Sequence, residues 1–491
     1  MLNRSPFFNA RRHKAPTPPR ALLHCRPTLQ RANLFKGSPR RFQKNALLAE
    51  PMFQFITNFL SSNKSGADTA AAIAPEMIDR NAREVVSTLQ KAGFEAYVVG
   101  GCIRDILLGH KPKDFDVATN AAPWEVKPLF RRARVIGRRF QIVHAQFGRE
   151  IIEITTFRAP ADTQESGNSR HMKQSDSGML TRDNVFGTME EDALRRDFTV
   201  NALYYDPSSD TLYDFADGLE DIKRRTLRII GDAATRYRED PVRMLRAVRF
   251  AAKLDFSIEK KTAAPIAKLA PMLGHISSSR LFDESLKLFL SGDGLATYQE
   301  LRHYRLLDEL VPGVISAEQD PTGHKLFELA FRNTDQRLAQ GKSITPAFIW
   351  AALLWPQIAH TAAQLEASGQ STSIAVEEAA NKVMSKQLSR TSIPRRFSQP
   401  MREIWEMQWR LPQRFGSRAE RLIERQRFRA AYDFLLLREE SGEQLDGLGE
   451  WWTRYQESDA EQRRQMVNLL GANGPRKKRR RRRPPRTKPD A

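Results

Sequence analysis

A chain of 491 residues, 40% of them hydrophobic, is long enough for two or three domains with their own cores. Its two cysteines, Cys25 and Cys102, are too few for a disulfide framework or a zinc site built from thiolates. The longest apolar run, Ala347 to Trp355, is roughly half as long as a membrane span requires. The composition therefore excludes a disulfide-stapled domain and a transmembrane protein, and it suits a reducing cytosol.

The net charge of +21 is concentrated in two arms. Residues 1–49 hold eleven Lys and Arg and no acid, and residues 476–491 hold ten Lys and Arg with one Asp, which leaves about +1 for residues 50–475. Such arms bind polyanions through charge without reading sequence, and their binding falls steeply with salt. A solvated tail without a partner is the alternative for the C-terminal arm. An organellar transit peptide or an unselected upstream extension is the alternative for the N-terminal arm.

The first part of the chain, residues 1–75, is predicted to be a disordered basic extension, because Pro and Arg and then Ser, Gly and Ala dominate it. Ordered structure is predicted to begin with an amphipathic helix from Ala74 to Leu89. The residues of its apolar face are Met77, Val85, Val86 and Leu89.

A strand, a tight turn and a helix are predicted next. The apolar run from Ala96 to Val99 indicates a buried strand that enters a turn at Gly100 and Gly101. Cys102 to Leu108 is predicted to be the following helix, closed by Gly109. Further strands are predicted at Phe115–Ala118, Gln141–Phe147 and Ile151–Thr156, which together give a mixed α/β head.

The pattern changes twice in the rest of the chain. Residues 161–183 are rich in Ser, Gly, Asn and Gln, which predicts a mobile loop inside the head. From about Arg236 onward apolar residues recur at spacings of three and four, which predicts an all-α second half.

Asp114 and Asp116 carry the strongest chemical signal. Two carboxylates at i and i+2 of a strand point to the same face, where they can share two divalent cations that assist displacement at phosphorus. The backbone N–H groups of Gly100 and Gly101, at a strand–helix turn, are predicted to contact phosphate oxygens, and Arg104 to join them. An Asp-x-Asp or a Gly-Gly pair alone is usually only a turn, but the two together at this spacing are far more specific.

The run VVGGCIRDILLGHKPKDFDVATNAAP resembles the signature of the polymerase-β-like nucleotidyltransferases of the second class, which include bacterial poly(A) polymerases and CCA-adding enzymes. The resemblance continues through IEITTFR (152–158), RRDFTVNALYYD (195–206) and YREDPVRMLRAVRFAAKL (237–254). It covers roughly residues 76–310. The helical remainder resembles bacterial poly(A) polymerases more loosely, through RFRAAYDFLLLR (427–438), a Trp pair (451–452) and the basic tail.

The resemblance implies a polymerase-β-like α/β head, an all-α neck and body, and disordered basic termini. Five segments are expected: the extension 1–75, the catalytic head 76–232, the helical neck 233–310, the helical RNA-binding body 311–470 and the tail 471–491. The expected RNA-binding residues of the tail are Arg476, Lys477, Lys478, Arg479 and Arg480.

The resemblance also assigns catalytic residues. It makes Asp114 and Asp116 the metal ligands and places Asp197 in the active site, near the nucleotide sugar. Asn201, four residues after Asp197, is expected on the same helical face. Glu153, on a strand of alternating pattern, is a rival third carboxylate, and a plain surface position is its alternative reading.

The segment Glu239-Asp240-Pro-Val-Arg243 resembles the base-reading motif of the family. By that resemblance Asp240 and Arg243 present a donor–acceptor edge to adenine and replace a template strand. Asp240 is also a good N-cap and Pro241 suits the first helical position, so a capped helix with a solvated basic face is the alternative reading. Arg195 and Arg196 are expected to support the triphosphate.

The implied function is template-independent polyadenylation of RNA 3′ ends from ATP, with release of pyrophosphate and with two Mg²⁺ or Mn²⁺ ions. Such tails mark RNA for processing or decay in the bacterial cytoplasm, and the sequence identifies no protein partner and no membrane. A CCA-adding enzyme with the same head is the nearest alternative. A non-catalytic RNA-binding or annealing protein is the distant one, because it would not need the three aspartates.

Overall fold

The computed structural model describes residues 73–137, 141–159, 172–174, 180–183, 185–314 and 320–472. The basic N-terminal arm and the predicted RNA-binding residues Arg476, Lys477, Lys478, Arg479 and Arg480 lie outside these ranges. Most of the predicted loop 161–183 lies outside them as well.

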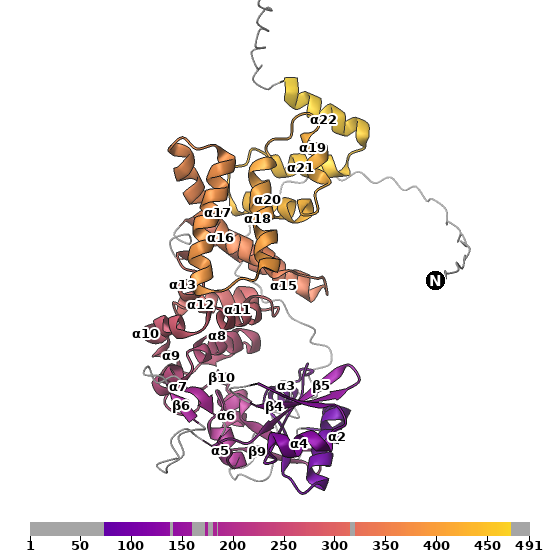
Figure 1. The fold of residues 1–491 in the computed structure, drawn as a ribbon, viewed down its shortest axis with the longest axis vertical. Helices are drawn as coiled ribbons and strands as arrows, with labels where there is room; N and C mark the ends of the chain where they lie inside the picture. Colours follow the sequence, from indigo (N-terminus) through magenta and orange to yellow (C-terminus); the bar gives the residue numbers. More distant parts are fainter. Residues whose placement is uncertain are drawn as a thin grey trace, which may run out of the picture. The chain divides into compact units, whose positions relative to one another are not determined.

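A seven-stranded mixed sheet forms the centre of the head, with the order β3-β4-β5-β2-β1-β8-β9 (Figure 1). Only β2 and β5 pair in parallel; the other neighbours are antiparallel. The strands are β1 (Ala96–Val99), β2 (Asp116–Thr119), β3 (Ala133–Ile136), β4 (Ile142–Phe147), β5 (Glu150–Thr156), β8 (Leu203–Asp206) and β9 (Thr211–Asp214). The predicted mixed α/β head is confirmed.

The first helix begins later than the apolar pattern predicted. A short 3-10 turn, η1 (Pro75–Met77), precedes α2 (Arg80–Lys91), and Met77 is exposed rather than on the buried face. The reason is Asp79, whose carboxylate accepts hydrogen bonds from the N–H groups of Asn81 and Ala82 and so fixes the start of the helix. Val85, Val86 and Leu89 are fully buried, as the pattern predicts.

Four more helices and one 3-10 turn complete the head. They are α3 (Gly101–Leu107), α4 (Pro123–Leu129), α5 (Met189–Leu194), η2 (Thr199–Asn201) and α6 (Gly218–Lys223). The prediction of a loop at 161–183 is wrong in part, because β6 (Met172–Gln174) and β7 (Leu180–Asp183) pair antiparallel within it. Two short strands, β10 (Thr226–Leu227) and β11 (Ser257–Ile258), pair in parallel at the start of the second half.

The described second half is otherwise helical, as predicted. Its first helices are α7 (Ala233–Glu239), α8 (Val242–Leu254), α9 (Lys260–Ala263), α10 (Ile266–Leu269), η3 (Ala270–His275), α11 (Ser278–Phe289), α12 (Gly294–His303) and α13 (Leu307–Leu310). Its later helices are α15 (Pro321–Ala339), α16 (Pro346–Ala367), α17 (Thr372–Arg390), α18 (Arg395–Arg410), α19 (Arg418–Ile423), α20 (Phe428–Ser441), α21 (Leu448–Glu457) and α22 (Ala460–Ala472).

Buried tryptophans hold the later helices together. Trp350, Trp405 and Trp452 are fully buried. The indole N–H of Trp405 donates to the carbonyl of Ala351 at 3.1 Å, and that of Trp452 donates to Leu411 at 3.1 Å. Trp405 and Trp452 thus bury a large apolar surface and still satisfy their polar atoms, whereas the indole nitrogen of Trp350 is buried without a hydrogen-bond partner.

None of the helices in the described ranges is long and apolar enough to cross a membrane. By their contacts, the described residues from 73 to 472 belong to one compact unit. The segment boundaries at 232, 310 and 470 therefore remain predictions.

Candidate active site

The turn between β1 and α3 can be made only by glycine. Gly100 has φ +83° and ψ −133°, a conformation that residues with a Cβ rarely adopt. A Cβ there would also lie 3.3 Å from Nη1 of Arg196. The N–H of Gly100 donates to the carbonyl of Leu203 at 3.0 Å, so this N–H already has an acceptor within the protein, and its contact with phosphate stays a prediction. Gly101 begins α3, where the first backbone N–H groups have no partner within the helix.

Asp114 and Asp116 lie where the turn meets the sheet. Asp114 is exposed and precedes β2, so only Asp116, its first residue, is on the predicted strand. In the parallel β2–β5 pair Asp116 stands opposite Glu153, which is exposed and whose Oε1 lies 3.4 Å from Nε2 of His144. Burial, then the charge of Glu153, raises the pKa of Asp116 to about 6; Arg196 opposes this and Asp114 adds to it.

These carboxylates fit a divalent cation. Hard ions such as Mg²⁺ prefer carboxylate oxygens, and a nearby positive charge would favour the ionised form of Asp116 that its neighbours disfavour. Within the described ranges, no group of three or more His, Cys, Asp or Glu side chains is already gathered closely enough to hold a metal. The side chains of Asp114 and Glu153 are both exposed. Asp114 lies two residues before Asp116 in the chain, and Glu153 lies beside Asp116 on the neighbouring strand β5.

Asp197 is bound on both oxygens by groups of the protein. Its Oδ1 accepts from the N–H of Phe198 at 2.8 Å and from Nδ2 of Asn201 at 3.1 Å, and its Oδ2 accepts from Nε of Arg246 at 2.7 Å. Although burial opposes ionisation, the Arg246 guanidinium and these hydrogen bonds lower the pKa of Asp197 to about 2. Asn201 does not share a helical face with Asp197 as predicted, because Asp197 precedes the 3-10 turn η2 that Asn201 ends; a side-chain hydrogen bond joins the two instead.

Arg104 ties α3 to the same network. Its guanidinium donates to Asp105 Oδ1 from Nε at 2.9 Å and from Nη2 at 2.5 Å, and Nη1 donates to Oδ1 of Asn201. The other oxygen of Asp105 lies 3.4 Å from Nζ of Lys253 on α8. Arg104 is therefore buried, charged and fixed in place beside the Gly-Gly turn.

A cavity of about 550 Å³ joins these elements. Its lining residues come from the turn, β2, the segment around Asp197 and α8: Gly100, Gly101, Cys102, Arg104, Asp105, Lys113, Asp114, Asp116, Arg196, Asp197, Asn201, Arg246, Arg249, Phe250 and Lys253. The structure thus brings together most of the site residues that the sequence predicts.

Four predicted residues do not line this cavity: Glu153, Arg195, Asp240 and Arg243. Glu153 lies beside Asp116 in the sheet. Asp240 accepts from Nη2 of Arg280 at 2.7 Å, and Arg243 donates to Oε2 of Glu239 at 2.7 Å. Asp240 also accepts from the N–H of Val242 at 3.3 Å, but Pro241 rather than Asp240 is the N-cap, because α8 begins one residue later than predicted.

Several lining residues were not predicted as site residues. For three of them, Asp105, Lys113 and Lys253, the sequence gives no signal of a role in the site apart from the family resemblance. Arg246 and Arg249 do carry one, because they follow Arg243 at spacings of three and so share its helix face. This face is half-buried against the site and is not the solvated face that was the alternative reading.

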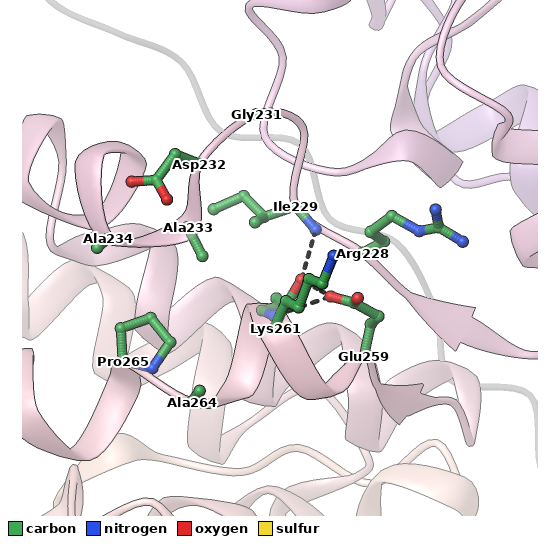
Figure 2. A pocket seen from close by; sticks show the side chains of 11 residues that line it. Arg228, Ile229, Gly231, Asp232, Ala233, Ala234, Glu259, Lys261, Ala264 and Pro265 are labelled. Atoms are coloured by element: carbon green, nitrogen blue, oxygen red, sulfur yellow. Dashed lines mark hydrogen bonds between the residues drawn. The ribbon is translucent and has the colours of Figure 1, made fainter.

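A second cavity, of about 610 Å³, lies away from these residues (Figure 2). Arg228 at its edge is paired with Asp221 at 2.7 Å. Glu259 accepts from the N–H and hydroxyl of Thr262 at 2.8 and 2.9 Å, and Asp232 accepts from the N–H of Thr235 at 2.8 Å. The two carboxylates of this second cavity, Asp232 and Glu259, therefore cap the helices α7 and α9. They are not neighbours in a sheet, as Asp116 and Glu153 are.

The mixed sheet and the acidic and basic cavity at the Gly-Gly turn define a nucleotidyltransferase. Two solved structures of a CCA-adding enzyme share the fold. Apo form II has a TM-score of 0.55 and 18% sequence identity, and the match covers 81% of this chain and 97% of that one. Apo form I has a TM-score of 0.54 and 20% sequence identity, and the match covers 79% of this chain and 83% of that one.

Sequence comparison gives the family. The family described as "Poly A polymerase head domain" matches residues 96–228, "Probable RNA and SrmB- binding site of polymerase A" matches 255–318, and "Polymerase A arginine-rich C-terminus" matches 368–487. Poly(A) polymerase I of Haemophilus influenzae is 47% identical over 80% of this chain and 88% of its own length; that of Salmonella typhi is 42% identical over 85% and 95%. The chain belongs to the bacterial poly(A) polymerase family.

Proposed function

We propose that this enzyme transfers AMP from ATP to RNA 3′ ends without a template, as the names of its relatives indicate. The observation that carries the proposal is the extent of the likeness. The poly(A) polymerase relatives match across the head and the helical second half, over 80–85% of this chain. The CCA-adding enzyme of Enterococcus faecalis is 37% identical over only 47% of this chain and 55% of its own length.

The reaction forms one bond and breaks one. The 3′ hydroxyl of the RNA loses its proton to solvent as its oxygen attacks the α-phosphorus of ATP, and the bond from that phosphorus to the oxygen that bridges to the β-phosphate breaks, so that pyrophosphate leaves with the bonding electrons. Enzymes of this class use nucleoside triphosphates and typically divalent metals. Two Mg²⁺ ions, when bound, would lower the pKa of the attacking hydroxyl and offset the charge of the triphosphate. Asp114 and Asp116 are the proposed ligands.

Glu153 is the proposed third carboxylate. Asp197 is less suited to that role, because hydrogen bonds within the protein already engage both of its oxygens. Glu153 is exposed and stands beside Asp116, and among the described residues its one ionic partner is His144 at 3.4 Å. Asp197 would then orient Arg246 and Asn201 toward the nucleotide, a positioning role rather than a metal-binding one.

The basic groups of the cavity suit the triphosphate. The N–H of Gly101 and the guanidinium of Arg104 lie at the turn, and Arg249 and Lys253 extend from α8 on the other wall. Arg196 is held beneath Gly100 by Asp192 and by the hydroxyl of Tyr204, so it contributes charge from a fixed position. Fixed charges of this kind stabilise charge that develops during transfer without first having to reorganise.

Adenine selection is assigned to Asp240 and Arg243, at the junction of α7 and α8. Both are engaged by protein groups, Asp240 by Arg280 and Arg243 by Glu239. Such pairing fixes the direction of each hydrogen-bonding group, and a fixed edge suits one base better than two.

The proposed segments are the head 76–232, the neck 233–310, the body 311–470 and the tail 471–491, in which Arg476, Lys477, Lys478, Arg479 and Arg480 bind RNA. The proposed location is the bacterial cytoplasm.

Extension of a labelled RNA with each nucleotide separately tests the proposal. A long ladder with ATP alone, abolished by a chelator, is the expected result. Addition of two C and one A to a truncated tRNA, without a ladder, would make the protein a CCA-adding enzyme instead. Absence of extension with every nucleotide would leave only RNA binding.

A further inference from the structure

Three guanidinium groups surround one aromatic ring in the active-site cavity. The Cζ atoms of Arg104, Arg246 and Arg249 lie 5.2, 5.2 and 4.6 Å from the centroid of the Phe250 ring. Arg104 comes from α3, and the other three residues come from α8. All four line the cavity. Distances of this size allow cation–π attraction between each guanidinium and the ring.

The ring itself is held in place. Phe250 is 8% exposed, and it packs edge to face against Phe198 with centroids 5.8 Å apart and planes at 81°. Phe198 is fully buried, and its N–H donates to Asp197. The ring is therefore fixed to the segment that carries Asp197.

The three cations differ in their other partners. Arg104 is paired with Asp105, and Arg246 with Asp197. For Arg249, the described residues provide no ion pair or hydrogen bond, and its Nε is buried without a partner. Burial, and then the charge of Arg246, lowers the pKa of Arg249 to about 10, so it stays protonated near neutral pH.

A cluster of like charges needs something that offsets their repulsion before the anionic substrate arrives. A carboxylate beside Arg249 would do so, but it would also neutralise the charge that the substrate has to meet. An aliphatic side chain would leave the charge intact but would add no attraction to that of the carboxylates that already act on these arginines, which are Asp105, Asp197 and, by its charge, Glu284. The face of an aromatic ring attracts cations and adds no net charge, so it stabilises the cluster without neutralising its positive charge.

We propose that Phe250 is a positioning residue that assembles Arg104, Arg246 and Arg249 into a preformed binding site for the polyphosphate of the incoming nucleotide. Arg249 is the member that contacts phosphate directly, because the other two also hold carboxylates of the protein. This role rests on the proposed function, since a nucleotidyltransferase must hold a triphosphate beside Asp114 and Asp116.

Fluorinated phenylalanines placed at position 250 of the full chain test the proposal without changing the shape of the ring. Each added fluorine weakens the attraction of the ring face for cations. The dissociation constant of inorganic tripolyphosphate, which has no base or sugar, should rise stepwise and reach about tenfold with the most fluorinated ring. The KM for ATP should follow it, whereas kcat should fall by less than about threefold. A dissociation constant that does not change along the series would overturn the proposal.

Ordinary variants give a second test. Phe250→Tyr should keep tripolyphosphate affinity within about twofold, whereas Phe250→Leu should lose about tenfold. Phe331→Leu, at a fully buried ring in α15, is the matched control and should leave this affinity unchanged. Equal losses in the Tyr and Leu variants would show that an aromatic face does not preserve the affinity and would overturn the proposal. If the wild type failed to extend RNA, the proposed function would fail, and the tripolyphosphate series would still decide the role of the ring.

Discussion

Two cavities in the described part of the structure are similar in size and differ in whether all of their carboxylates have partners. The cavity of about 610 Å³ contains Asp232 and Glu259, and hydrogen bonds from Thr235 and Thr262 lower the pKa of each, in Glu259 against the effect of burial. The cavity of about 550 Å³ contains Asp116, whose pKa burial and Glu153 raise to about 6.

The difference shows which property marks the active site. Carboxylates that cap helices already have their partners, so they have no need of a ligand. A carboxylate crowded by others gains stability when a cation binds, and the unpaired Arg249 gains when an anion binds. Charge that lacks a partner, rather than cavity volume, identifies the site of chemistry.

The largest expected effect comes from removing the charge of Asp116. In Asp116→Asn, single-turnover AMP transfer should fall by about a thousandfold, because a metal ligand contributes several kcal/mol to the transition state. RNA affinity should stay within about twofold. Glu259→Gln, in the other cavity, is the control and should leave transfer unchanged. A comparable loss in both variants would mean that the contrast between the cavities is not functional.

Glu153 and Asp197 should differ in kind. Glu153→Gln should lower transfer by about a hundredfold and raise the Mg²⁺ concentration needed for half-maximal rate, since it removes a proposed metal ligand. Asp197→Asn should raise the KM for ATP and leave the Mg²⁺ dependence unchanged, because it releases Arg246 and Asn201. Steady-state rates across a Mg²⁺ titration separate the two. The reverse pattern would make Asp197 the third carboxylate.

Removing the tail should act on RNA rather than on chemistry. Deletion of residues 476–491 takes away ten Lys and Arg, so RNA affinity should fall by about tenfold at moderate salt, with a shallower dependence on salt. Single-turnover transfer at saturating RNA should change by less than about threefold. Filter binding across a salt series measures the slope, and an unchanged slope would exclude the tail as an RNA contact.

The smallest expected effect is on stability against pH. The pKa of Asp116 is raised from 3.8 to about 6, so without metal this group favours the folded state at low pH, and the contribution is lost as pH rises through 6. Mg²⁺ binds the ionised form and should therefore raise the melting temperature by a few degrees more at pH 7.5 than at pH 5. In Asp116→Asn that difference should vanish. Its persistence would assign the effect to another group.

Local features of the fold were predictable because each signal lies within a short stretch of sequence. The strand Ala96–Val99, the turn at Gly100 and the helix after it follow from one apolar run and two glycines. The start of α2 was predicted too early, because the apolar spacing of Met77 was given more weight than the capping side chain of Asp79. The strands β8 and β9, of four residues each, are too short for a clear alternating pattern.

The site was predictable in its members but not in its pairings. Asp114, Asp116, Asp197, Asn201 and the turn line one cavity as expected. The ion pair between Arg246 and Asp197, however, joins residues 49 positions apart, and no local pattern encodes it. The role of Phe250 is equally unpredictable, because in the sequence this residue is an ordinary apolar residue of an amphipathic helix.

Binding of Mn²⁺ to the nucleotide-free protein tests the central claim most directly, since it measures whether the crowded carboxylates hold a metal. Free Mn²⁺ would be measured by electron paramagnetic resonance for the wild type, Asp116→Asn and Glu259→Gln. The wild type and Glu259→Gln should bind alike, and Asp116→Asn should bind at least about tenfold more weakly. Equal binding by all three proteins would contradict the account, because the metal would then lie elsewhere.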